Sequence, residues 1–240
     1  MDLTVTGVVV AVVIIIFGSV VQGTIGFGLG LLAAPFIAIV IPDAIPVTLV
    51  LVAWPIGGVT ALREHHALDR KALPWMLTGA VPGTAIGLVI IHLASQEALA
   101  VIVGFTTILG VLATVVTPPI PVTPVTATGA GFIGNINGTA ASVGGPPVAL
   151  LFQHHRGPAV RATLGAYFAI SATLSVVGYG VTGAITLDRF LLAVGLLPAM
   201  LFGAWASKHF HGLVDKGWLR PSVLVLSSIA GTIAVIRGLV

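Results

Sequence analysis

The sequence predicts an all-α polytopic membrane protein, and three observations support this fold class. Of the 240 residues, 57% are hydrophobic and only 7% are charged, and the mean hydropathy is +1.15. Soluble domains carry about 25% charged residues, so this chain could not cover a water-facing surface. Long apolar runs follow one another along the chain, whereas the short alternating segments of a β-barrel are not found.

We expect one transmembrane domain, residues 1–240, with about 8–10 hydrophobic segments. The apolar segments are Val8–Gln22, Gly30–Ile41, Pro46–Leu62, Leu73–Leu93, Ala98–Val116, Val122–Asn137, Pro146–Phe152, Ala162–Val181, Phe190–Ser207 and Pro221–Ile236. A spanning helix needs about 20 residues, and the third to fifth segments of each half come close to this length. The first two of each half are shorter. They could be half-helices, a re-entrant pair or one long broken helix.

Two Gly/Pro-rich stretches, Gly23–Pro35 and Gly138–Pro147, interrupt these short segments. Glycine adds conformational freedom and proline removes an amide donor, so neither stretch favours an ordinary spanning helix. Irregular backbone at membrane depth is tolerated only where it is buried in protein or lines a cavity. We therefore predict that the two breaks face each other near the membrane midplane and form the functional centre.

The two halves of the chain resemble each other, which predicts an internal duplication: repeat 1 at about 1–117 and repeat 2 at about 120–240. Three short matches keep their order at offsets of 115 to 119 residues: Gly23-Thr24 with Gly138-Thr139, Thr48-Leu49 with Thr163-Leu164, and Leu68-Asp69-Arg70 with Leu187-Asp188-Arg189. A duplicated unit with an interrupted helix at matching positions is typical of transporters.

The basic residues of the loops favour inverted over parallel halves. Parallel halves would divide the ten Lys and Arg residues five against five, which contradicts a positive-inside bias. Inverted halves leave only Arg189 and Arg237 on one side, with both termini, and gather on the other side Arg63, Arg70, Lys71, Arg156, Arg161, Lys208, Lys216 and Arg220. The same bias explains the net charge of +3, so we expect no nucleic-acid partner.

Broken helices predict an anion site, because a helix start presents unpaired N–H groups and the positive end of its dipole. The candidate substrate-binding residues are Gln22, Gly23, Thr24, Gly26 and Gly28 of the first break, and Asn135, Asn137, Gly138, Thr139, Ser142, Gly144 and Gly145 of the second. For any single glycine, close helix packing is the competing explanation. Asn135 and Asn137 are the strongest candidates, because an amide in hydrocarbon must find a partner. If one break alone contacts substrate, we expect the second.

Other chemistries find little support in the sequence. No Asp, Glu, Lys or Arg lies in the central part of a segment, and the chain has no cysteine. His65-His66 and His154-His155 are expected in solvated loops, and Arg156 and Arg161 near the second break. No protease-type zinc motif or serine elbow is present, so we expect no enzyme, no metal and no cofactor. A structural subunit would not need amide-rich breaks in both halves.

Gly26-Phe27-Gly28 with Pro35, and Gly144-Gly145-Pro146 in the second half, resemble the signatures of the sulfite exporter TauE/SafE family. The resemblance extends over essentially the whole chain. It implies an inner-membrane secondary transporter that exports a small sulfur-containing anion, sulfite or an organosulfonate, by alternating access. A passive anion channel and a transporter of a non-sulfur organic anion are the alternatives. The expected partners are the anion and the lipid bilayer, and a homodimer is left open.

Overall fold

The computed structural model describes residues 4–118, 120–152, 155, 157–210 and 219–239, and the side chains of 219–223 are excluded. No strand occurs among these residues, and the predicted all-α class is confirmed. The α-helices are α1 (Val5–Ile25), α2 (Leu29–Val40), α3 (Val47–Arg63), α4 (Ala72–Leu93), α5 (Gln96–Val116), α6 (Pro124–Ala141), α7 (Gly145–Leu151), α8 (Gly157–Val181), α9 (Leu187–Ala206) and α11 (Leu219–Leu239). Short 3-10 turns η1 (Pro42–Ala44), η2 (His65–Ala67) and η3 (Ser207–Phe210) join some of them.

Each predicted apolar segment coincides with one of these helices. Five described helices, α1, α4, α5, α8 and α9, are long and apolar enough to cross a bilayer, so the chain is a multi-pass membrane protein. The expectation that the first segment is short was wrong, because α1 has 21 residues. Gly23 and Thr24 continue the helix, which ends only at Gly26, where the backbone is left-handed with φ 100°.

Each break folds its two helices into a hairpin. A Cβ atom at Gly7, near the start of α1, would lie 3.3 Å from the carbonyl of Val40 at the end of α2, so α2 runs back along α1. Likewise, a Cβ atom at Gly134 of α6 would lie 3.3 Å from Cγ1 of Val148 within α7, so α7 runs back along α6. In each break the second helix therefore turns back along the first, which excludes one long broken helix among the three forms that the sequence left open.

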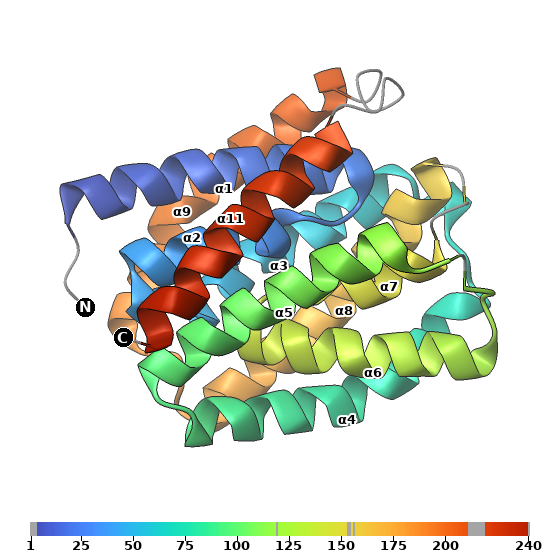
Figure 1. Ribbon diagram of the computed structural model, residues 1–240. Helices are drawn as coiled ribbons and strands as arrows, with labels where there is room; N and C mark the ends of the chain where they lie inside the picture. The colour runs from blue at the N-terminus through green and yellow to red at the C-terminus, as the bar shows by residue number, and fades with distance from the viewer. Residues whose placement is uncertain (1–3, 119, 153–154, 156, 211–218, 240) are drawn as a thin grey trace.

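Around the hairpins, the longer helices pack in pairs: α1 against α9, α4 against α6, α3 against α8 and α5 against α11 (Figure 1). Glycine allows the closest of these contacts. A Cβ atom at Gly79 of α4 would lie 2.0 Å from the carbonyl of Thr128, and one at Gly83 would lie 2.5 Å from that of Phe132. At these glycines, helix packing is the sufficient explanation.

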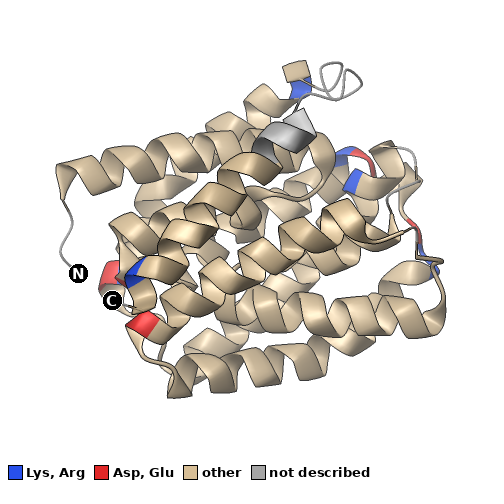
Figure 2. Ribbon diagram, viewed as in Figure 1, with Lys and Arg blue, Asp and Glu red and all other residues tan. Residues whose placement is uncertain are grey.

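Charged residues lie at the two ends of the bundle, and the helices between them are uncharged in their middle parts (Figure 2). Among the described residues, Arg189 and Arg237 lie at one end, together with the start of α1. The cations at the other end, at or beside the end of α3, the starts of α4 and α8 and the end of α9, are Arg63, Arg70, Lys71, Arg161 and Lys208. Arg156 and Lys216, and the side chain of Arg220, lie outside the described residues. This grouping is the one expected for inverted halves, but the inverted repeat itself stays a prediction.

Candidate functional site

The two hairpin tips, residues 26–28 and 142–144, lie in contact at the points where α2 and α7 begin. A Cβ atom at Gly30, in the first turn of α2, would lie only 1.7 Å from the carbonyl oxygen of Ser142. One at Gly145 would lie 2.9 Å from the ring of Phe27. The structure therefore brings together two stretches that are more than 100 residues apart in the sequence.

Left-handed backbone conformations form both tips. Gly26 and Gly28 have φ values of 100° and 125°, which residues with a side chain rarely adopt. Ser142 at the second tip has φ 60°, and its hydroxyl donates to the carbonyl of Pro46 at 3.0 Å. The side-chain hydrogen bond ties the second tip to the start of α3, so the turn is held from outside as well as by its own geometry.

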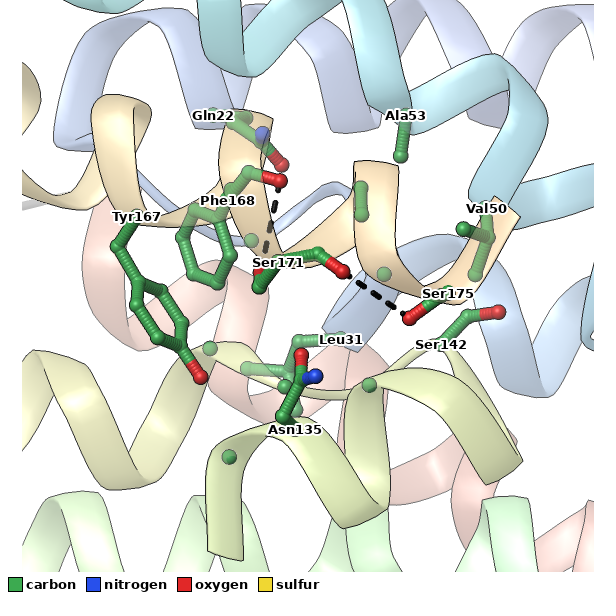
Figure 3. Close-up of a pocket in the computed structure, with 17 residues that line it drawn as sticks. Gln22, Leu31, Val50, Ala53, Asn135, Ser142, Tyr167, Phe168, Ser171 and Ser175 are labelled. Atoms are coloured by element: carbon green, nitrogen blue, oxygen red, sulfur yellow. Dashed lines mark hydrogen bonds between the residues drawn. The ribbon is translucent and has the colours of Figure 1, made fainter. Parts of the chain in front are cut away.

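A cavity of about 70 Å³ lies between the tips and helices α3 and α8 (Figure 3). This volume is enough for several water molecules or one small ion. The cavity is lined by Gln22, Gly28, Gly30, Leu31, Val50, Ala53, Gly134, Asn135, Gly138, Ser142, Gly144, Gly145, Tyr167, Phe168, Ser171, Ala172 and Ser175. Of the residues predicted from the sequence, it includes Gln22, Gly28, Asn135, Gly138, Ser142, Gly144 and Gly145.

Three candidates of the first break lie outside the cavity, because α1 stays helical to Ile25 and turns them to other faces. A Cβ atom at Gly23 would lie 2.3 Å from the hydroxyl of Ser207 in η3. The hydroxyl of Thr24 donates to the carbonyl of Val20, within the same helix. A Cβ atom at Gly26 would lie 3.1 Å from the Cα atom of Arg161.

Two candidates of the second break, Asn137 and Thr139, also lie outside the cavity. Asn137 is two residues beyond Asn135, which is about 200° around α6, and it is half-buried away from the cavity lining. Thr139 is buried one turn beyond Asn135, and its hydroxyl lies 2.8 Å from the hydroxyl of Ser175. Thr139 thus contacts a lining residue without lining the cavity itself. Of the two strongest candidates, only Asn135 reaches the cavity.

Each of the two cavity amides has one group free to bind a solute, a donor in Gln22 and an acceptor in Asn135. Gln22 Oε1 accepts a hydrogen bond from the backbone N–H of Leu29 at 3.3 Å, which leaves the Nε2 donor without a partner in the described chain. Asn135 Nδ2 donates to the carbonyl of Ala80 at 3.0 Å and to the hydroxyl of Thr84, which leaves the Oδ1 acceptor. Figure 3 shows the two amides approaching the cavity from opposite sides.

Helix α8 supplies lining residues that the sequence analysis did not identify. Ser175 Oγ donates to the carbonyl of Ser171 at 3.2 Å, and Ser171 Oγ lies 3.5 Å from the carbonyl of Phe168 (Figure 3). Tyr167 is buried and its hydroxyl donates to the carbonyl of Gly131 at 2.9 Å. Tyr167, Ser171 and Ser175 recur every four residues in an apolar segment, and this polar stripe on one helix face was the available signal.

Arg161 contacts the first tip, not the second as expected. Its Nη1 donates to the carbonyl of Thr24 at 3.3 Å. Its Nη2 lies 2.6 Å from Glu64 Oε1 in an ion pair whose side chains are 13% and 21% exposed. The guanidinium is therefore already neutralised by a carboxylate. Arg156, the other cation expected at a break, lies outside the described residues.

The histidines give no metal centre within the described part of the chain. His65 and His66 are exposed, with their ring centroids 3.6 Å apart. No group of three or more His, Asp or Glu side chains gathers among the described residues. His154 lies outside them.

Apolar helices long enough to span a bilayer, charges confined to the two ends and a polar cavity between two helix hairpins define a polytopic membrane protein with an internal polar cavity. The family model described as sulfite exporter TauE/SafE matches residues 10–233, nearly the whole chain, and the chain belongs to this family. Membership implies a membrane transporter of sulfur-containing anions such as sulfite, since the members of this family are transporters. Searches of curated proteins and of solved structures returned no match.

Proposed function

We propose that this chain is a secondary transporter that exports small sulfur-containing anions, sulfite or an organosulfonate, across the inner membrane by alternating access. The observation that carries the proposal is the cavity where the two hairpin tips meet. It lies between the charged ends of the bundle, it is lined by amides and hydroxyls, and each half of the chain contributes one tip to it.

Hydrogen-bond donors at the first tip support anion binding. The backbone N–H groups of Gly30 and Leu31, in the first turn of α2, have no partner in the described chain, and both residues line the cavity. The positive end of the α2 dipole adds to their effect. Gln22 Nε2 is a third donor in the same region. The proposal therefore assigns these donors to the first break, whereas the sequence favoured the second.

Contacts on both sides of the cavity support alternating access. Toward the more basic end, the Arg161–Glu64 pair and its bond to Thr24 hold the first tip against α8. Toward the other end, Val50 of the cavity packs in one buried cluster with Val47 and Tyr179. Val47 lines a separate hollow of about 400 Å³ that opens at this end. A route to either side therefore requires one set of contacts to open.

The helix pairing is consistent with rocking of inverted halves. Exchanging α1–α5 for α6–α11 turns the α1–α9 pair into the α6–α4 pair, and it turns the α3–α8 and α5–α11 pairs into themselves. A duplicated unit related by a two-fold axis would have this pairing, and transporters of this kind expose their central site by moving one set of helices against the other.

The central test exchanges one amide for a carboxylate. Gln22→Glu keeps the acceptor for the Leu29 N–H but replaces the Nε2 donor by a negatively charged oxygen. We expect uptake of sulfite or methanesulfonate into proteoliposomes to fall at least about tenfold, since a charge-assisted hydrogen bond is lost and a like charge is gained. Asn137→Asp makes the same change outside the cavity and should retain most of the uptake. The opposite ranking of the two variants would reject the cavity as the site.

A channel and a carrier of other anions are separated by two measurements. A carrier shows saturable uptake and accelerated exchange when unlabelled anion is present inside, whereas a passive channel shows neither. A ligand that binds the native state raises its thermal stability by mass action, so purified protein can be screened with sulfite, methanesulfonate and small carboxylates. Stabilisation by carboxylates alone would contradict the sulfur specificity.

A further inference from the structure

The central cavity is polar but carries no charge. Within the described residues, none of its lining side chains is Asp, Glu, Lys, Arg or His. The polar lining consists of the amides of Gln22 and Asn135 and the hydroxyls of Tyr167 and three serines. An ion that enters this cavity is therefore stabilised by dipoles alone.

The cation beside the first tip does not change this balance. Arg161 donates from Nε and Nη2 to Glu64 Oε1, at 2.9 and 2.6 Å, and from Nη1 to the carbonyl of Thr24. With its carboxylate partner in place, the guanidinium adds no net charge to the site. Arg189 at the other end lines a different hollow, beyond the cluster of Val47, Val50 and Tyr179.

The charge of the substrate decides whether such a site can hold it. The free energy needed to move an ion from water into a low-dielectric interior grows with the square of the charge, so a dianion costs about four times as much as a monoanion. A few neutral donors, here Gln22 Nε2 and the N–H groups of Gly30 and Leu31, can offset the cost for one charge. The number of these donors is the same for a dianion, so they cannot offset its larger cost.

Asn135 adds a second constraint, because its free group is an acceptor. The Nδ2 bonds to Ala80 and Thr84 fix the orientation of the amide. Its Oδ1 lies on the cavity side, 3.7 Å from where a Cβ atom at Gly138 would be. A carbonyl oxygen repels a bare oxyanion but accepts a hydrogen bond from a protonated one.

We propose that the cavity selects singly charged sulfur oxyanions and binds sulfite in its protonated form, hydrogensulfite, with the substrate proton donated to Asn135 Oδ1. This inference rests on the proposed function and names the ionic form that the site takes. Sulfonates fit the charge requirement but give Asn135 no donor. Sulfate and the sulfite dianion carry two charges and do not meet the charge requirement.

The test compares three anions in proteoliposomes over a range of pH around neutrality, where sulfite changes between its singly and doubly charged forms. Methanesulfonate stays a monoanion and sulfate stays a dianion throughout. We expect pH-independent uptake of methanesulfonate, no uptake of sulfate above that of empty liposomes, and sulfite uptake that falls about tenfold per pH unit above its second ionisation. Sulfate uptake comparable to that of methanesulfonate, or sulfite uptake that follows the dianion, would overturn the inference and leave the transport function standing. No uptake of any of the three would overturn both.

A variant isolates the contribution of the acceptor. Asn135→Ala removes Oδ1, and the ratio of hydrogensulfite to methanesulfonate uptake should fall about three- to tenfold. Thr84→Val breaks part of the same link to α4 but keeps Oδ1, so it should leave the ratio unchanged. Because each ratio is measured on one preparation, a smaller folded fraction does not affect it. An unchanged ratio in Asn135→Ala would remove the acceptor from the proposal.

Discussion

Gly30 determines how closely the two hairpin tips approach each other. Its position allows the carbonyl of Ser142 to lie where any other residue would place its Cβ atom. The residue is helical, so the requirement comes from space and not from backbone conformation. Gly28, two residues earlier, is constrained differently, since its φ of 125° already excludes most side chains. Neighbouring glycines thus serve two distinct physical purposes at one site.

The space requirement predicts the effect of the smallest substitution. In Gly30→Ala, the added methyl group overlaps the Ser142 carbonyl and must push the tips apart, which we expect to cost about 1–3 kcal/mol of stability and most of the transport. Thermal unfolding in detergent and uptake into proteoliposomes measure the two effects. Gly58→Ala on α3 is the matched control, because a Cβ atom there meets nothing within 4 Å. If both variants behave alike, the tips are not held by this contact.

At the scale of elements, hydrophobic length and glycine placement predicted each helix, but not which residues of a break face the cavity. The sequence shows where Gly and Pro disfavour a continuous helix, and the hairpin tips lie at those points. It does not show that α1 runs on to Ile25, and this extension turns Gly23 and Thr24 away from the cavity. The lining from α8 could not be placed either, because it depends on long-range packing against the tips. Only its polar stripe is visible locally.

The Arg161–Glu64 pair joins three elements: α8, the end of α3 and the tip of the first hairpin. Both side chains are largely buried, and Glu64 Oε2 has no hydrogen-bond partner among the described residues. Removing either charge should leave the other uncompensated, so Glu64→Gln and Arg161→Gln should each lower stability. The double variant should lose less than the sum, with a coupling of about 1–3 kcal/mol.

Denaturant or thermal unfolding of the four proteins in this cycle measures the coupling. Arg63→Gln serves as the comparison, since Arg63 at the same end donates to the carbonyl of Ala204 and has no carboxylate partner in the described chain. The loss of stability in Arg63→Gln should add to the loss in Glu64→Gln without a coupling. Additivity in the Arg161 cycle as well would mean that the pair contributes no more than an exposed ion pair.

At the scale of the whole molecule, the fold places an uncharged cavity between two ends of different charge. The described cations gather mainly at the end with Arg63 and Lys208, whereas Arg189 and Arg237 bond to carbonyl groups near the end of α2 at the other end. Since the two hairpins start from opposite ends and contact each other at their tips, a movement of either tip changes the contacts of the other. Binding of an anion between the tips can therefore be coupled to opening on either side.

The absence of cysteine from the chain makes this movement measurable. Ser171→Cys places one thiol in the cavity, and a membrane-impermeant thiol reagent reports from which side it can be reached. If access alternates, the thiol reacts in both right-side-out and inverted vesicles, and substrate slows the reaction from both sides. Exposed positions at the two ends, His66→Cys and Ser95→Cys, should each react from one side only and be insensitive to substrate. Reaction of Ser171→Cys from a single side, with or without substrate, would contradict alternating access and favour a fixed, one-sided pocket.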